Sequence, residues 1–312
     1  RSSDLLCAGW QAGQGPAGLG QHRCPVGAAL GIAARLEPQL AQQVQHHGRA
    51  VQARRHQHGQ RPPQQFGTGI AEAALGLAVD GFDAAIASNP AFAAWAKRCL
   101  HAHKMPGYCA VTLSLKTHGQ APGDASSEQM HAVADLAAQY SFGELRVSHE
   151  QNLILADVKL SDAFALWEKA RAQGLASPNI GLLTDIICCP GGDFCSLANA
   201  KSIPIAQAIQ MQFDNLDYLH DIGELELNIS GCMNACGHHH IGHIGILGID
   251  KDGSEWYQVT LGGSQGNQAS LGTVIGPSFS AEEMPHVVEK LISVYLAERN
   301  GEERFIDTVR RL

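Results

Sequence analysis

Apolar and polar positions follow a regular period only from about residue 76 onward. The first elements that this pattern predicts have the order β-α-β-β-α, and they cover residues 109–115, 124–140, 144–148, 152–156 and 161–173. Ser127 or Asp124 is the expected N-cap of the first helix, and Gly174 is expected to end the second. This order is typical of a ferredoxin-like α+β half-domain, which we expect over residues 76–178.

A second and larger α+β domain is predicted over residues 179–312. Its expected elements are a helix, three strands and a C-terminal helix, over residues 193–212, 224–229, 243–249, 256–261 and 280–299. Pro204 is expected to break the first helix, and residues 252–253 (Asp-Gly) to form a tight turn between two strands. Ser280 and Glu283 form a candidate capping box at the start of the last helix.

Residues 1–75 differ from the rest of the chain and are predicted to have no confident fold. The first 68 residues contain twelve Gln, five His and seven Arg, but no Lys and only two acidic residues. Residues 39–65 show no sustained helical or strand period, and Pro62 and Pro63 would interrupt either structure. One interpretation is a low-complexity, disordered tail. The other is a coding-frame error, which the abrupt loss of Lys and acidic residues suggests.

Composition narrows the class of protein. A chain of 312 residues is long enough for about two domains with their own apolar cores. The formal net charge of -8 argues against a nucleic-acid partner, and the interrupted apolar stretches argue against a membrane partner. Nine cysteines are too few for a disulfide scaffold, and an odd number cannot all pair within one chain. Because the chain starts with Arg and shows no signal peptide, we expect a fragment of a cytoplasmic protein.

Four cysteines in two pairs carry the candidate chemistry. Five residues separate Cys189 from Cys195, three separate Cys232 from Cys236, and 36 residues lie between the pairs. Thiolates are ligands for soft metals, and zinc is one candidate. Structural zinc sites usually have two to four residues between paired cysteines, so the longer first loop favours a larger group such as an iron–sulfur cubane.

The residues around the first pair suggest how its loop is built but do not settle which cysteine binds or which metal is bound. Gly191 and Gly192 are expected to let the loop turn sharply and to direct backbone N–H groups at sulfur. Cys188 precedes Cys189 directly, so the spacing alone does not decide which of the two is the ligand. A zinc-binding α/β protein without a redox role also stays open as an alternative.

The two pairs resemble the assimilatory sirohaem-containing nitrite and sulfite reductases. The resemblance rests on Cys-x5-Cys followed by Cys-x3-Cys, with the second pair in a Ser-Gly-Cys-x-Asn-x-Cys-Gly context. It runs from about residue 85 to the C-terminus and includes residues 143–152 (GELRVSHEQN). It selects Cys189 over Cys188 and implies that Cys189, Cys195, Cys232 and Cys236 hold a 4Fe-4S cluster. It also implies that Cys236 is the axial ligand of a sirohaem iron.

The resemblance implies a function as well as cofactors. We expect an oxidoreductase of sulfur assimilation that reduces sulfite to sulfide by six electrons, with reduction of nitrite to ammonia as the alternative. The electron donor would be a flavoprotein or ferredoxin. The chain matches only the C-terminal half of that family. Residues 69–312 contain 15 Lys and Arg, which is few for an anionic cofactor and substrate, so we expect the chain alone to be incomplete.

Two further sets of side chains are candidates for the site. Sirohaem has many carboxylates, so Arg146 is a possible cofactor contact, although an arginine in a strand more often faces solvent. His238, His239, His240 and His243 follow the second cysteine pair. Three consecutive histidines cannot all face one point in an extended segment, so we favour loop packing and hydrogen bonds to the cofactor over a ligand role.

Overall fold

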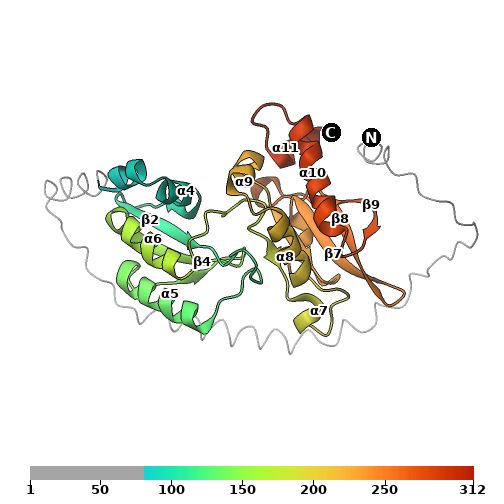
Figure 1. Cartoon of the computed structure of the whole chain (residues 1–312), viewed down its shortest axis with the longest axis horizontal. Coiled ribbons are helices and arrows are strands. Elements are labelled where there is room, and N and C mark those ends of the chain that lie inside the picture. The colour runs from blue at the N-terminus through green and yellow to red at the C-terminus, as the bar shows by residue number, and fades with distance from the viewer. Residues whose placement is uncertain (1–80) are drawn as a thin grey trace, which may run out of the picture. The chain divides into compact units, whose positions relative to one another are not determined.

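The computed structural model describes residues 81–312, and the predictions for residues 1–75 lie outside this range. The first part of the described chain contains α4 Pro90–Cys99, β1 Leu100–Ala102, β2 Tyr108–Leu113, α5 Ser127–Tyr140, β3 Arg146–Val147, β4 Leu153–Lys159, the 3-10 turn η2 Leu160–Asp162 and α6 Ala163–Ala172. Its strands form an antiparallel sheet of order β1-β2-β4-β3 (Figure 1). The predicted β-α-β-β-α order is therefore confirmed, with β1 as an additional edge strand that the pattern did not indicate.

One apolar core joins this sheet to its helices. Phe92 of α4 and Trp167 of α6 are buried, with ring centroids 5.5 Å apart. They share the core with Leu136 of α5 and with Val111 and Leu155 of the two central strands. The burial of a large aromatic pair and branched side chains supplies most of the driving force for this part of the fold.

The second part of the described chain contains more elements than the sequence predicted. They are β5 Ile187–Cys188, α7 Gly191–Phe194, α8 Ile203–Gln212, α9 Leu216–Ile222, β6 Leu227–Ser230, η3 His239–Ile241, β7 Ile244–Lys251, β8 Ser254–Leu261, η4 Gly266–Gln268, β9 Thr273–Phe279, α10 Met284–Glu298 and α11 Phe305–Arg311. The strands form a mixed sheet of order β5-β6-β7-β8-β9. β5, β6 and β7 run parallel, and β7, β8 and β9 run antiparallel. The fold class is α+β, as predicted.

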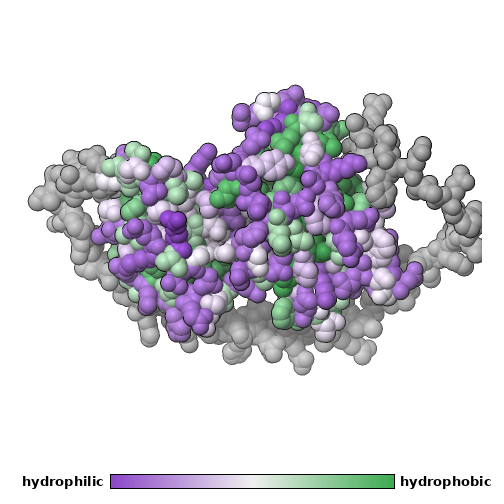
Figure 2. Space-filling model, in the orientation of Figure 1, coloured by the Kyte–Doolittle hydropathy of each residue, from purple (hydrophilic) through white to green (hydrophobic). Residues whose placement is uncertain are grey.

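Strand β6, which lies between β5 and β7, is buried along its whole length. The strand predicted over residues 224–229 is confirmed in part, since β6 begins at Leu227 and ends at Ser230. Ile229 of β6 and Ile246 of β7 lie in a core with Ile209 of α8 and with Val288 and Ile292 of α10. In Figure 2, hydrophilic residues cover most of the visible described surface, and apolar residues form small groups over α8 and α10.

The helix predicted over residues 193–212 is interrupted, but the interruption lies between α7 and α8 and not at Pro204 as predicted. Pro204 lies in the first turn of α8, where its missing N–H would have no intrahelical partner anyway, so it starts the helix and does not break one. The chain before α8 leaves the helical path because Asn199 and Ala200 donate their N–H groups to the carbonyl of Gly231. These bonds tie the first cysteine loop to the second.

Two helix starts also differ from the prediction. The N-cap of α5 is Ser126 and neither Ser127 nor Asp124, because its side chain accepts from the N–H of Gln129 while the Gln129 side chain accepts from the N–H of Ser126. Helix α10 begins only at Met284, with a proline in its first turn. The turn at residues 252–253 is confirmed, and both of its residues have the positive φ of a tight hairpin.

No helix in residues 81–312 has both the length and the apolar character needed to cross a bilayer.

Replacing Ser126 tests its assignment as the N-cap of α5. Ser126→Ala removes the Oγ that accepts from the Gln129 N–H and leaves only the bond from the residue 126 N–H to the Gln129 side chain, so the free energy of unfolding should fall by about 1 kcal/mol. Urea unfolding followed by circular dichroism measures this change. The matched control is Ser127→Ala, because that exposed hydroxyl contacts only the neighbouring Glu128 side chain. Equal losses in the two variants would contradict the assignment of the cap.

Candidate functional site: two cysteine loops at the ends of parallel strands

The four motif cysteines lie in two loops that follow neighbouring parallel strands. Cys189 comes directly after β5, and Cys195 follows the short helix α7. Cys232 and Cys236 lie in the loop after β6. Because β5 and β6 are parallel and adjacent, their carboxyl ends meet at the same edge of the sheet. The topology therefore brings together two pairs that are far apart in the sequence.

Hydrogen bonds join the two loops at Cys189. Its N–H donates to the carbonyl of Ile229 at 3.1 Å, which extends the β5–β6 ladder by one residue. In return, the N–H of Gly231 donates to the Cys189 Sγ at 3.1 Å, and the Ser202 Oγ lies 3.4 Å from the same sulfur. An N–H donor at sulfur stabilises the thiolate form, which is the form that binds metals.

The approach of the two loops is close enough to require glycine. A Cβ atom added at Gly231 would lie 2.6 Å from the Ala200 carbonyl oxygen and 2.9 Å from the Gly191 Cα. We predicted that Gly191 and Gly192 would direct N–H groups at sulfur, but the Gly192 N–H donates to Ala200 and the donor to Cys189 is Gly231. The sequence analysis used the Ser-Gly-Cys context only for the family resemblance and did not identify Gly231 as the donor to sulfur.

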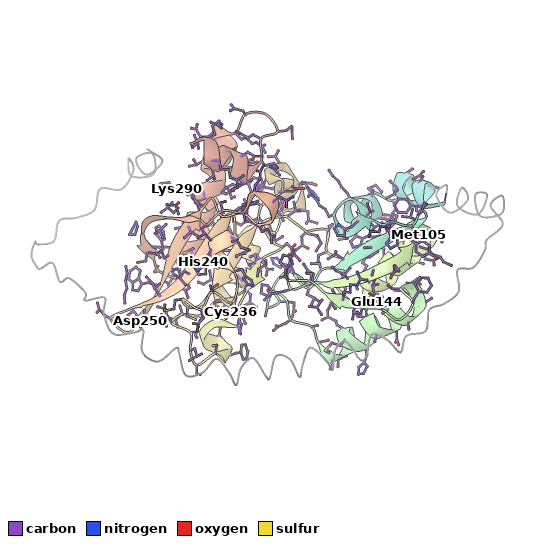
Figure 3. The ribbon with its side chains drawn as sticks, turned by 180° about the vertical axis from the view of Figure 1, so that it is seen from behind. Met105, Glu144, Cys236, His240, Asp250 and Lys290 are labelled. Carbon is purple, nitrogen blue, oxygen red and sulfur yellow. The ribbon has the colours of Figure 1, made fainter. Side chains whose placement is uncertain are left out.

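The four thiols are free but differ in exposure. Cys189 and Cys232 are buried, Cys195 is partly exposed and Cys236 is exposed. Figure 3 labels Cys236, together with His240 further along the chain. The donor set of four unpaired thiols from two loops is chemically suited to an iron–sulfur cluster, and the exposed thiol is accessible to a further group.

Cys188 is poorly suited to be the ligand in place of Cys189. Burial, followed by the neighbouring Cys189, raises the pKa of the Cys188 thiol far above its ordinary value. Its Sγ lies 3.2 Å from the Cys189 carbonyl oxygen, to which it donates. A neutral thiol that uses its proton in this way is a structural group.

Cys109 of β2 lies outside the two motif pairs. Burial raises the pKa of its thiol to about 12, so it is also a structural group.

Large apolar side chains are exposed beside the cysteines. Phe194 is 79% exposed, Leu197 70% and Met233 82%, and all three lie within two residues of a motif cysteine. Exposed apolar groups of this size, gathered on loops that also carry reactive thiols, are typical of a surface that another apolar body covers.

In the described residues 81–312, no group of three or more His, Cys, Asp or Glu side chains is close enough to hold a single metal ion. A cubane cluster requires a wider arrangement, because four irons and four sulfides lie between its thiolates.

The histidines after Cys236 do not converge on one point. His238 and His240 are exposed while His239 between them is buried. The segment is not extended as we expected, because His239 and His240 begin the 3-10 turn η3 and their ring centroids lie 3.9 Å apart. His239 Nδ1 is buried without a hydrogen-bond partner. His243 Nδ1 accepts from the Glu226 N–H at 3.2 Å. The arrangement agrees with loop packing, and a hydrogen bond from any of them to a cofactor stays a prediction.

Arg146 lies in the edge strand β3 with an exposed side chain. Its Nε donates to the Glu144 carboxylate at 2.6 Å. This is the surface ion pair expected of a solvent-facing arginine, and such pairs contribute little to stability. Contact with a sirohaem carboxylate stays a prediction for this residue.

The fold and the cysteine loops define an α+β protein with four free thiols in two adjoining loops. Two family models match the chain, the "Nitrite/Sulfite reductase ferredoxin-like half domain" over residues 101–173 and the "Nitrite and sulphite reductase 4Fe-4S domain" over residues 182–312. Together they cover more than half of the chain, which belongs to the nitrite and sulfite reductase family. The domain boundary predicted at residue 178 lies between the two matches and stays a prediction.

The similar proteins include reductases named for each of the two anions. An assimilatory ferredoxin-dependent nitrite reductase of Haloferax mediterranei is 30% identical over 55% of this chain and 30% of its own length. A ferredoxin–nitrite reductase of Synechococcus elongatus is 27% identical over 66% of this chain and 40% of its own. A ferredoxin sulfite reductase of Mycolicibacterium paratuberculosis is 29% identical over 63% of this chain and 38% of its own. The chain thus spans 30% to 40% of the length of these relatives.

Solved structures show the same fold. The Mycobacterium tuberculosis NirA protein superposes with a TM-score of 0.58 at 26% identity, over 69% of this chain and 40% of that one. A dissimilatory sulfite reductase I superposes with a TM-score of 0.53 at 12% identity, over 66% of this chain and 67% of that one, and is evidence for the fold alone.

The contact between the loops can be tested with one methyl group. Gly231→Ala places a Cβ against backbone atoms that cannot move independently, so it should force the loops apart and lower the free energy of unfolding by about 1–3 kcal/mol. Urea unfolding of the purified chain measures the loss. Gly192→Ala is the matched control, because its Cβ would lie no nearer than 3.4 Å to any neighbour. An unchanged Gly231→Ala protein would contradict the close approach.

The second site prediction concerns acid stability. Burial, followed by Arg304 and Arg310, lowers the pKa of His243 from 6.5 to about 4. The folded state therefore favours the neutral ring, and this stabilisation is present above pH 6.5 and is lost as the pH falls toward 4. His243→Gln keeps a hydrogen-bond acceptor without a proton to gain, so its urea midpoint should fall less between pH 7 and pH 4.5. The matched control is His286→Gln at an exposed position, and its urea midpoint should fall as much as that of the unmodified chain. An equal fall for His243→Gln would contradict the assignment.

Proposed function

We propose that this chain is the sirohaem- and 4Fe-4S-binding C-terminal half of an assimilatory sulfite reductase haemoprotein. In this proposal Cys189, Cys195, Cys232 and Cys236 hold the cluster, and Cys236 is also the axial ligand of the sirohaem iron. The bound cofactors would relay electrons from the external donor and would supply the iron site for a six-electron reduction. The chain's own residues would hold the thiolates, stabilise their charge and exclude water from the buried side of the cluster.

The observation that carries the proposal is the meeting of the two cysteine loops at Cys189. A sulfur that receives a backbone N–H from the opposite loop is held in place before any metal arrives, which lowers the cost of assembling a four-thiolate site. The neutral, buried Cys188 favours Cys189 as the ligand.

The exposed side of the site supports a second, larger group next to the cluster. The Cys236 thiol is accessible, and Phe194, Leu197 and Met233 beside the cysteines are exposed. A macrocycle and the remainder of the enzyme would cover such a surface. The remainder would also supply basic residues for the anionic substrate, so we propose that the chain alone does not turn over efficiently.

Substrate and donor are the finer parts of the proposal. Sulfite is the proposed substrate, and nitrite is the second candidate because two of the similar relatives, at 30% and 27% identity, are named nitrite reductases. Ferredoxin is the proposed donor, since the names of the relatives of both kinds include it. A flavoprotein is the other donor compatible with the sequence.

Serine variants of the adjacent residues Cys188 and Cys189 provide the sharpest test of the proposed cluster. The chain is reconstituted with iron and sulfide without oxygen, and iron, acid-labile sulfide and visible absorption are measured. The unmodified chain and Cys188→Ser should each bind about four irons. Cys189→Ser should lose most of this iron and the cluster absorption, because it removes a thiolate that the opposite loop already holds.

Two results would contradict the proposal. A colourless chain that takes up one zinc would support the non-redox alternative. Equal iron in both serine variants would remove Cys189 from the ligand set.

A further inference from the structure

The strand that leads into Cys189 is short and lies at the edge of its sheet. β5 has two residues, and it pairs with β6 on one side only. In this pairing the N–H of Cys189 faces β6, so the N–H and carbonyl of Cys188 face the opposite direction. An edge strand with two residues has few bonds of its own to hold its position.

The side chain of Gln151 occupies the open side of this strand. Its Nε2 donates to the Cys188 carbonyl at 2.8 Å, and its Oε1 accepts from the Cys188 N–H at 2.9 Å. One side-chain amide thus satisfies both backbone groups of Cys188, as a further strand would do. We call this pair of hydrogen bonds the Gln151 amide bridge.

The backbone around Gln151 is specialised for this position. Gln151 has a φ of 61°, in the left-handed region that a glutamine rarely adopts. Gly123 packs against it, where an added Cβ would lie 2.9 Å from the Gln151 Cβ. A non-glycine residue keeps such a conformation only where the surrounding structure fixes it, which marks the position for a specific contact.

Neighbouring side chains fix the same strand. Lys116, only 2% exposed, donates from Nζ to the Ile186 carbonyl at 2.7 Å. Asn152 Nδ2 donates to the Asp185 carboxylate at 3.0 Å. These bonds run from the ferredoxin-like half-domain to Asp185, Ile186 and Cys188. The amide bridge is the last of them before the candidate ligand.

We propose that Gln151 is a positioning residue for Cys189, so that the ferredoxin-like half-domain holds one ligand of the cluster in place. The inference rests on the proposed function, because Cys189 needs exact placement only if it binds the cluster. Loss of the bridge frees the edge strand, and the Cys189 thiolate then dissociates from iron more readily.

The test follows release of the cluster from the reconstituted full chain. Gln151→Ala and the unmodified protein are mixed with an iron chelator without oxygen, and the decay of visible absorption is recorded well below the unfolding temperature. Loss of two hydrogen bonds should speed iron release about tenfold. The electron paramagnetic resonance spectrum of the reduced cluster should also change, which a remote loss of stability would not cause.

Two further variants keep the result interpretable. Gln151→Asn keeps an amide and suits a positive φ, but it is one methylene too short for both contacts, so it should fold and still release iron faster. Gln207→Ala is the matched control, because Gln207 Nε2 donates from α8 to the Gly119 carbonyl at 3.2 Å, away from β5. It should release iron at the unmodified rate.

The possible failures are distinguishable. An unmodified chain that binds no iron–sulfur cluster would overturn the proposed function and this inference with it. A normal cluster in the unmodified chain, released at the same rate from both Gln151 variants, would overturn the positioning role alone. Equally fast release from Gln207→Ala would also overturn it, since any contact with the half-domain would then have the same effect.

Discussion

Cys189 and the end of β6 exchange two hydrogen bonds in opposite directions, and the geometry of the candidate site depends on them. The Cys189 N–H bonds to the Ile229 carbonyl, and the Gly231 N–H bonds to the Cys189 sulfur. Both bonds require β5 and β6 to be parallel neighbours, because only then do two strand ends with their loops meet at one edge. The mixed sheet, its buried strand β6 and the apolar core that the sheet forms with α8 and α10 all hold this edge in place.

The sequence predicted the elements whose periodicity reflects a half-buried surface. The strand around Val111, the α5 helix and the 252–253 turn follow their local patterns closely. β6 was predicted from the alternation of residues 224–229 although all four of its residues are buried, whereas β5 was too short to show a pattern. The interruption before α8 was not predictable locally, since it depends on bonds to Gly231, which lies far along the chain.

In the site, too, local sequence patterns were readable and contacts between distant positions were not. Cysteine spacing and the glycine context were sufficient to select the four thiols and to suggest their chemistry. The donor to Cys189 and the Gln151 amide bridge were not predictable, because each joins positions more than 35 residues apart. Exposure divides the site further. Cys189 and Cys232 are buried, whereas Cys195 is partly exposed between the exposed Phe194 and Leu197, and Cys236 is exposed. This asymmetry is consistent with a chain that spans less than half of its relatives' length.

X-ray absorption at the iron edge of the anaerobically reconstituted chain tests the central claim most directly, because it reports the neighbours of each metal atom. Our account predicts that every iron is surrounded by about four sulfurs and has other irons close by, as in a cubane held by four thiolates. Iron without an iron neighbour would contradict it, since the two cysteine loops would then hold a mononuclear site or none.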